Sequence, residues 1–296
     1  MQRLERSASV RQGRGMIERE LAGLGPHGFH RLAYVEWPAP SRFAPVLLCI
    51  HGLTRNSRDF DVLAQALSSH YRVICPDMPG RGKSDWLVDP ADYNYAVYLA
   101  DIAALVARLD VARVDWLGTS MGGIIGMLFA AQPGAPLGKL VINDVGPLVP
   151  KAAIERIAAY VGLNPGFADL GAFEAVLRRV HAPFGPLSDA QWSHLATHSS
   201  RRNPDGSIGF NYDPKIAEAF RQGPIEDVDL WSTWDAIACP VLALRGAQSD
   251  ILPKDAAEAM TRRGPRARLV EFAGIGHAPA LMEADQIAAI RDFLLG

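Results

Sequence analysis

One stretch of the sequence decides the fold: Val114-Asp115-Trp116-Leu117-Gly118-Thr119-Ser120-Met121-Gly122-Gly123-Ile124. A short apolar run typical of a buried strand leads directly into a G-x-S-x-G pattern and then into a helix-like segment. A serine on so sharp a strand-to-helix turn is forced into strained backbone angles, and the flanking glycines let neighbouring chain pass closely. The pattern therefore predicts a Ser120 hydroxyl raised above a sheet edge, beside the positive end of a helix.

On either side of this turn, the sequence alternates between strand-like and helix-like segments. Short apolar runs of the kind buried on both faces of a parallel sheet occur at 45–50, 71–75, 114–117, 140–142, 240–244 and 267–272. Amphipathic stretches lie at 59–68, 95–109, 122–131 and 284–295. This alternation predicts an α/β fold with a doubly wound, mostly parallel sheet.

The alternation stops between about residues 145 and 233. This region is rich in prolines and large aromatic residues, and its sequence pattern is typical of helices and loops. We interpret residues 146–232 as a mostly helical cap inserted between the sixth and seventh sheet strands. The core then comprises residues 17–145 and 233–296, preceded by a polar N-terminal extension at 1–16.

A serine hydroxyl needs a base, and the base needs an acid that orients it. His277 follows a late strand in a glycine-flanked loop, and Asp250 lies in the loop that ends the strand before it. The chain order Ser120, Asp250, His277 leaves room for one helix and one strand between the acid and the base, and it is the order that this fold requires. Asp144 also follows a strand and is the competing candidate for the acid, although the Gly-Pro after it favours a hinge.

An oxyanion formed at Ser120 would need hydrogen-bond donors. The His51-Gly52 turn after the early strand is expected to present the backbone N–H of Leu53 toward Ser120. Together with the N–H of Met121 it would form a two-donor oxyanion hole. We interpret His51 itself as structural, because the shape of the turn is what matters.

These motifs resemble those of the α/β-hydrolase superfamily. The resemblance is carried by His51-Gly52, by the segment Asp77-Met-Pro-Gly-Arg-Gly-Lys-Ser84, by the turn at Ser120, and by Asp250 and His277. It covers about two-thirds of the chain, roughly residues 29–145 and 233–296. It implies that the segment beginning at Asp77 is a turn-shaping loop after the fourth strand. The cap carries no motif that we can match, so the substrate is not inherited with the fold.

The predicted reaction is hydrolysis of a small-molecule carboxylic ester through an acyl-enzyme on Ser120. Serine at this position disfavours the haloalkane dehalogenases and epoxide hydrolases that resemble this fold, because those use an aspartate nucleophile. Hydrolysis of enol-lactones, thioesters or carbon–carbon bonds of β-diketone-like substrates uses the same constellation and remains open. A ligand-binding receptor on the same fold is a more distant alternative.

Composition excludes several other classes. The 296 residues carry 30 Lys and Arg against 32 Asp and Glu, so a nucleic-acid partner is not expected. We find no apolar run long enough for a membrane span and no apolar core in the charged N-terminus that would make it a secretory signal. Three cysteines without metal-ligand spacing indicate buried thiols in a reducing, cytoplasmic compartment. The oligomeric state remains open.

Three short patterns fail the test of context. Residues 23–28 match G-x-G-x-x-G but precede a strand, and Gly82-Lys83-Ser84 lacks the first glycine of a phosphate loop. His194 and His198 have the spacing of metal ligands on a helix, but the sequence shows no third ligand. We therefore expect no cofactor and no metal.

Overall fold

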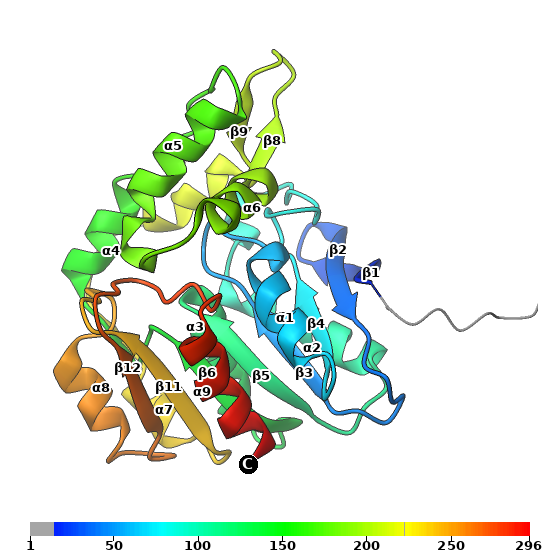
Figure 1. Cartoon of the computed structure of the whole chain (residues 1–296), viewed down its shortest axis with the longest axis vertical. Helices are drawn as coiled ribbons and strands as arrows, with labels where there is room; N and C mark the ends of the chain where they lie inside the picture. The colour runs from blue at the N-terminus through cyan, green and yellow to red at the C-terminus, as the bar shows by residue number, and fades with distance from the viewer. Residues whose placement is uncertain (1–14, 222) are drawn as a thin grey trace, which may run out of the picture.

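The computed structural model describes residues 15–221 and 223–296, and its centre is one twisted eight-stranded sheet (Figure 1). The strand order is β1-β2-β4-β3-β5-β6-β11-β12. The first two pairings in that order are antiparallel and the other five are parallel. The strands are β1 (Ile17–Gly25), β2 (Gly28–Trp37), β3 (Val46–Ile50), β4 (Arg72–Pro76), β5 (Val114–Thr119), β6 (Leu137–Asn143), β11 (Val241–Gly246) and β12 (Arg268–Phe272).

Helices cover both faces of the sheet, as a doubly wound fold requires. On one face pack α2 (Tyr95–Arg108), α3 (Met121–Ala130), α7 (Trp231–Asp235) and α8 (Lys254–Met260). On the other face pack the 3₁₀ turn η1 (Ser57–Phe60), α1 (Asp61–Leu67) and α9 (Ala284–Leu295). The expected doubly wound, mostly parallel fold is confirmed.

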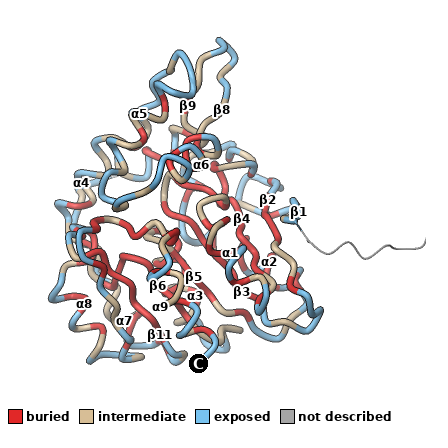
Figure 2. The backbone as a smooth tube through the Cα atoms, viewed as in Figure 1, coloured by how far each residue is buried: buried red, intermediate tan, exposed pale blue. Residues whose placement is uncertain are grey.

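The unbroken apolar runs of the sequence are strands because both of their faces are buried. Along β3, Val46, Leu48 and Ile50 belong to the core on one face, and Leu47 and Cys49 to the core on the other. Figure 2 shows this burial as a continuous red band along the central strands. Each such strand buries apolar side chains on two sides, which is the main driving force for this architecture.

Between β6 and β11 the chain leaves the sheet, and its described residues add no strand to it. This segment rises above the carboxyl ends of the strands (Figure 1). It holds α4 (Lys151–Ala158), α5 (Leu170–Val180), α6 (Asp189–Ser199), the 3₁₀ turns η3 (Ala182–Phe184) and η4 (Pro214–Phe220), and two small ribbons, β7 (Leu148–Val149) with β10 (Val228–Asp229) and β8 (Ser200–Arg202) with β9 (Ile208–Phe210). We call it the insertion. It contains its own apolar cluster around Phe173 and Trp192.

The N-terminal part of the chain forms a hairpin. The β1–β2 turn closes at the pair Gly25 and Gly28, with Gly28 at a φ of 115°, a left-handed angle that only glycine adopts at little cost. The G-x-G-x-x-G match therefore belongs to a hairpin turn rather than to the start of a helix. Residues 1–14 of the predicted extension lie outside the described residues, and β1 starts at Ile17.

Two further sequence features can be located. The cysteines are unpaired thiols: Cys49 and Cys75 are buried and Cys239 is half-buried. None of the helices in the described ranges combines the length and the apolar character that crossing a bilayer demands.

Candidate active site

Ser120 lies in the sharp turn between β5 and α3. Its backbone has a φ of 53° and a ψ of −116°, strained angles for a non-glycine residue. The glycines around it are required by close backbone contacts. A Cβ on Gly118 would lie 2.1 Å from the Gly122 carbonyl oxygen, and a Cβ on Gly122 would lie 2.1 Å from that of Ile50. The turn that the sequence predicts is present, and it presents Ser120 at the carboxyl end of the sheet.

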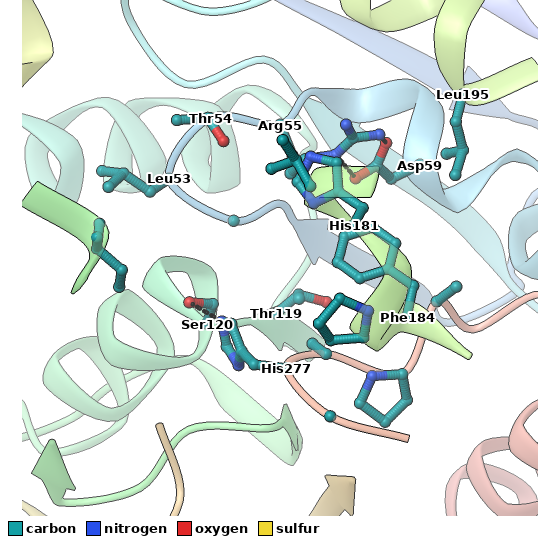
Figure 3. A pocket seen from close by; sticks show the side chains of 18 of the residues that line it. Leu53, Thr54, Arg55, Asp59, Thr119, Ser120, His181, Phe184, Leu195 and His277 are labelled. Atoms are coloured by element: carbon teal, nitrogen blue, oxygen red, sulfur yellow. Dashed lines mark hydrogen bonds and ion pairs between the residues drawn. The ribbon is translucent and has the colours of Figure 1, made fainter. Parts of the chain in front are cut away.

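His277 reaches Ser120 from the loop that follows β12. Its Nε2 lies 2.9 Å from Ser120 Oγ, a hydrogen bond that is drawn in Figure 3. On the opposite side of the ring, Nδ1 lies 2.8 Å from a carboxylate oxygen of Asp144. A carboxylate can only accept, so Nδ1 carries the proton and Nε2 is free to accept from the serine hydroxyl.

The acid beside His277 is Asp144, and the prediction that Asp250 takes this place is wrong. Asp144 directly follows β6 at a φ of 58°, and its side chain is fully buried. Its Oδ1 accepts the Gly246 N–H at 2.7 Å, and its Oδ2 accepts the Ser249 hydroxyl at 2.7 Å. The last residue of β11 and the loop behind it thus hold the carboxylate against the imidazole.

Asp250 is directed elsewhere. Its carboxylate accepts two hydrogen bonds from Arg156 of α4, at 2.6 and 3.0 Å, and both side chains are about half exposed. Four residues beyond the end of β11, it faces the insertion rather than His277. The pair connects the insertion to the β11–α8 loop.

The predicted oxyanion donors flank Ser120. Met121 is the first residue of α3, so its N–H has no carbonyl acceptor one turn earlier in that helix. The peptide that carries the Leu53 N–H is fixed at its other end, because His51 Nδ1 donates to the Gly52 carbonyl at 2.7 Å. Fixing that carbonyl points the N–H of the same peptide the opposite way. Both residues line a cavity together with Ser120.

His51 is fully buried and neutral. Its Nε2 accepts the Met78 N–H at 2.9 Å while Nδ1 donates, so adding a proton would break one of the two bonds. Burial lowers its pKa from 6.5 to about 3. The structural role expected for His51 is thus to hold the turn that contains Leu53.

The segment beginning at Asp77 shapes a turn. The Asp77 carboxylate accepts the backbone N–H groups of Ser57 at 2.7 Å and Lys83 at 2.8 Å. A Cβ on Gly82 would lie 2.2 Å from that carboxyl group, which leaves no room for a phosphate. Burial raises the pKa of Asp77.

The strongest arrangement for a metal ion in the described residues is Asp61, His194 and His198, whose ligand atoms lie within 4.8 Å of one another. Asp61 is the third potential ligand that could not be identified from the sequence, because it lies in α1 and the two histidines lie in α6. Arg58 occupies this cluster: its Nε donates to Asp61 at 2.9 Å, its Nη1 lies 3.4 Å from His198, and its carbonyl accepts from His194 at 2.9 Å. As it stands, the cluster attaches the insertion to the core through a guanidinium.

Comparison with known proteins agrees with this geometry. The model of the family described as the alpha/beta hydrolase fold matches residues 45–284. The chain belongs to the α/β-hydrolase family. Its resemblance to that family, and the fold that the resemblance implies, are confirmed.

Several hydrolases and esterases are similar over most of the chain. A 3-hydroxybutyrate-oligomer hydrolase of Cupriavidus necator is 44% identical over 92% of this chain and 96% of its own length. A pimeloyl-[acyl-carrier protein] methyl ester esterase of Xanthomonas axonopodis is 28% identical over 82% of this chain and 92% of its own length. The crystal structure of an alpha/beta hydrolase from Novosphingobium aromaticivorans is 39% identical, with a TM-score of 0.85 and coverage of 95% of this chain and 98% of that one. These relatives support a hydrolase acting on a small molecule.

Proposed function

We propose that this α/β-hydrolase cleaves carboxylic esters with Ser120 as nucleophile, His277 as general base and Asp144 as the acid that orients it. The observation that supports this most is the continuous line of hydrogen bonds from the Ser120 hydroxyl through both ring nitrogens of His277 to Asp144. Without such a base a serine hydroxyl is a poor nucleophile at neutral pH.

The reaction follows from this arrangement in two halves. His277 Nε2 takes the Ser120 proton as Oγ attacks the acyl carbon, and the N–H groups of Leu53 and Met121 bind the oxyanion. His277 then gives the proton to the departing alcohol, which leaves an acyl-enzyme. Water attacks this ester by the same route in reverse order, so that an acid and an alcohol are released and Ser120 is restored.

The first substrate to test is an oligomer of 3-hydroxybutyrate. The relative that is 44% identical is named for hydrolysis of such oligomers, and the match covers almost all of both chains. Each linkage in such an oligomer is a secondary alkyl ester, which is the bond that the proposed site cleaves.

A fluorophosphonate probe and an ester series test the proposal together. We expect an adduct on Ser120 by mass spectrometry, turnover of p-nitrophenyl acetate and butyrate, and release of 3-hydroxybutyrate from its dimer. Ser120→Ala should remove the adduct and lower kcat by roughly four orders of magnitude or more. Ser69→Ala, which removes an exposed serine just after α1 and outside the site, is the control and should still be labelled. Labelling that persists in Ser120→Ala would contradict the assignment.

A further inference from the structure

Two cavities of different character meet at Ser120. One has a volume of about 330 Å³ and includes charged and polar side chains: Arg55, Asp59, Arg156, His181, Gln248 and Asp250. The other has a volume of about 320 Å³ and is mainly aliphatic, with Ile124, Val145, Val149, Ile154, Ile216 and Ile251 in its wall. We call them the charged chamber and the apolar chamber. The two halves of an ester bound at Ser120 would thus meet different chemistry.

The positions of the proposed catalytic groups indicate which half of the ester lies in which chamber. This step rests on the proposed function. His277 lines the charged chamber, and Met121 lines the apolar one. The group that gives its proton to the departing alcohol must lie beside that alcohol. The alcohol half therefore occupies the charged chamber, and the acyl half lies in the apolar chamber.

Arg55 is the buried cation of the charged chamber. Its side chain is only 7% exposed, and its Nε and Nη2 donate to Asp59 at 2.8 and 2.6 Å. Within the described ranges its Nη1 group has no hydrogen-bond partner. Gly52 lies between this side chain and the nucleophile, since a Cβ on Gly52 would be 3.6 Å from Arg55 Cγ and 3.7 Å from Ser120 Cβ. Asp59 thus holds the guanidinium in the chamber that Ser120 also lines, and Nη1 remains unused among the described residues.

His181 supplies a second donor next to Arg55. It follows α5, so it belongs to the insertion, and its ring packs against Phe184 with centroids 4.5 Å apart. In the part of the chain that the structure describes, neither ring nitrogen has a hydrogen-bond partner. Burial, and after it the Arg55 charge, places the pKa of His181 well below 6.5, so the neutral ring offers one N–H. Figure 3 shows Arg55, Asp59 and His181 together on the side of the chamber facing Ser120 and His277.

We propose that the charged chamber binds a free carboxylate on the alcohol half of the ester, through Arg55 Nη1 and the N–H of His181. Charge-assisted hydrogen bonds from a guanidinium are the common means of recognising a carboxylate. The substrate class is then an ester whose alcohol is a hydroxy acid. Each chamber is near the lower limit of ~300 Å³ for ligand pockets, which favours short substrates.

This orientation fixes the direction of cleavage. Ser120 Oγ bonds to the acyl carbon, the ester C–O bond breaks, and the hydroxy acid leaves with the proton from His277. Water then supplies a hydroxyl to the acyl carbon and a proton to Ser120 Oγ. On an oligomer of hydroxy acids, the first product is the unit at the carboxyl end.

Two substrates that differ in one group test the proposal: the 3-hydroxybutyrate dimer as the free acid and as its methyl ester. We expect the wild-type chain to prefer the free acid in kcat/KM by about tenfold or more, mostly through KM. Arg55→Gln should remove that preference by lowering kcat/KM for the free acid toward the value for the methyl ester, because the variant lacks the proposed partner of the carboxylate. His181→Gln should reduce the preference in part, because it removes the second donor.

Arg156→Gln is the matched control. It removes the same charge from the same chamber, and Arg156 is likewise paired with an aspartate, but its side chain is 45% exposed. It should keep the preference for the free acid. Loss of the preference in Arg156→Gln but not in Arg55→Gln would overturn the assignment to Arg55. The comparison of the free acid with the methyl ester uses the wild-type chain, so it decides whether a free carboxylate is preferred even if Arg55→Gln does not fold.

A trimer labelled with ¹³C in its carboxyl-terminal unit tests the direction. Labelled monomer should appear first, and unlabelled monomer appearing first would overturn the proposed orientation. Equal kcat/KM for the free acid and the methyl ester would overturn this inference and leave ester hydrolysis standing. Absence of turnover on every ester, with no adduct on Ser120, would overturn the proposed function itself.

Discussion

Asp144 accepts three hydrogen bonds next to the proposed nucleophile. Three donors from two parts of the chain reach its two oxygens within 2.8 Å: the Gly246 N–H and the Ser249 hydroxyl from the end of β11 and its loop, and His277 Nδ1 from the loop after β12. With this carboxylate fixed, the imidazole keeps its proton on Nδ1 and its Nε2 lone pair toward Ser120. The orientation of His277 therefore depends on Asp144.

Replacing this carboxylate tests the residue-scale argument. Asp144→Asn should lower kcat by about 10⁴-fold, because an amide can hold the ring in the wrong tautomer. Asp250→Asn should leave kcat near wild type, since its exposed pair with Arg156 contributes at most ~1 kcal/mol to stability. Steady-state kinetics on one ester with both variants decides it. A large loss of kcat in Asp250→Asn with activity retained in Asp144→Asn would return the acid to the later loop.

The sequence could point to Ser120 and His277, which the structure brings together, but not to Asp144 as the carboxylate beside them. Both aspartates follow sheet strands, and those strands, β6 and β11, are direct neighbours in the sheet. The local sequence therefore predicts both carboxyl groups at the same edge of the sheet. The two aspartates differ in contacts that only the folded chain makes. Gly246 and Ser249 donate hydrogen bonds to Asp144, whereas Arg156 of the insertion donates to Asp250. The position of Asp144 directly after its strand is the one sequence signal that favours it.

The geometry of the β5–α3 turn depends on how closely helix α3 packs against the backbone of strand β3. The carbonyl oxygen of Ile50 would be 2.1 Å from a Cβ on Gly122, and backbone cannot move away as a flexible side chain can. The same closeness brings the start of α3 beside the turn that contains Leu53. The two glycines of the motif therefore serve the approach of two elements as well as the strained angles of Ser120.

A glycine pair tests this close approach. Gly122→Ala should destabilise the fold by about 3 kcal/mol or more and abolish ester turnover, because strand β3 and helix α3 must separate. Gly171→Ala, in α5, is the matched control: its Cβ would meet nothing closer than 3.4 Å. It should be neutral or stabilise the helix by up to ~1 kcal/mol. Chemical denaturation of both variants measures the difference, and equal stabilities would contradict the argument.

At the scale of elements, sequence patterns predicted best what is buried on two sides. The apolar runs at 45–50 and 240–244 became β3 and β11, and the amphipathic stretch 284–295, which buries one face, became α9. The small ribbons of the insertion were not predicted, because strands of two or three residues carry no periodicity. The pair His194 and His198 was recognised by its spacing, but Asp61 was missed, because it comes from the core and only the folded chain brings it to the insertion.

The molecule as a whole keeps several histidines neutral. Burial lowers the pKa of His51 to about 3 and that of His198 to about 4, and it places the pKa of His181 well below 6.5. Of these, His51 belongs to the core between β3 and the loop after β4, and the other two belong to the insertion. Acid should therefore weaken both the core and the attachment of the insertion.

The sign of this effect follows from proton binding. The unfolded chain protonates His51 as the pH falls through about 6.5, whereas the folded chain resists until about pH 3. The free energy of unfolding should thus be independent of this group above about pH 6.5 and should decrease below it, by up to ~1.4 kcal/mol per pH unit. Asp77 and Asp101, whose pKa values burial raises, act in the opposite direction over part of this range.

His51→Gln isolates the contribution of one histidine from those opposing groups, which the variant shares with the wild-type chain. At pH 7 the variant should be less stable, because glutamine does not reproduce both bonds of the ring, to Met78 N–H and to the Gly52 carbonyl. Between pH 6.5 and 4.5 it should lose less stability than wild type, by about 1 kcal/mol per pH unit. Urea unfolding at four pH values measures both slopes. Parallel slopes would mean that His51 is protonated in the folded chain, and the neutral hydrogen-bonded ring that positions Leu53 would have to be given up.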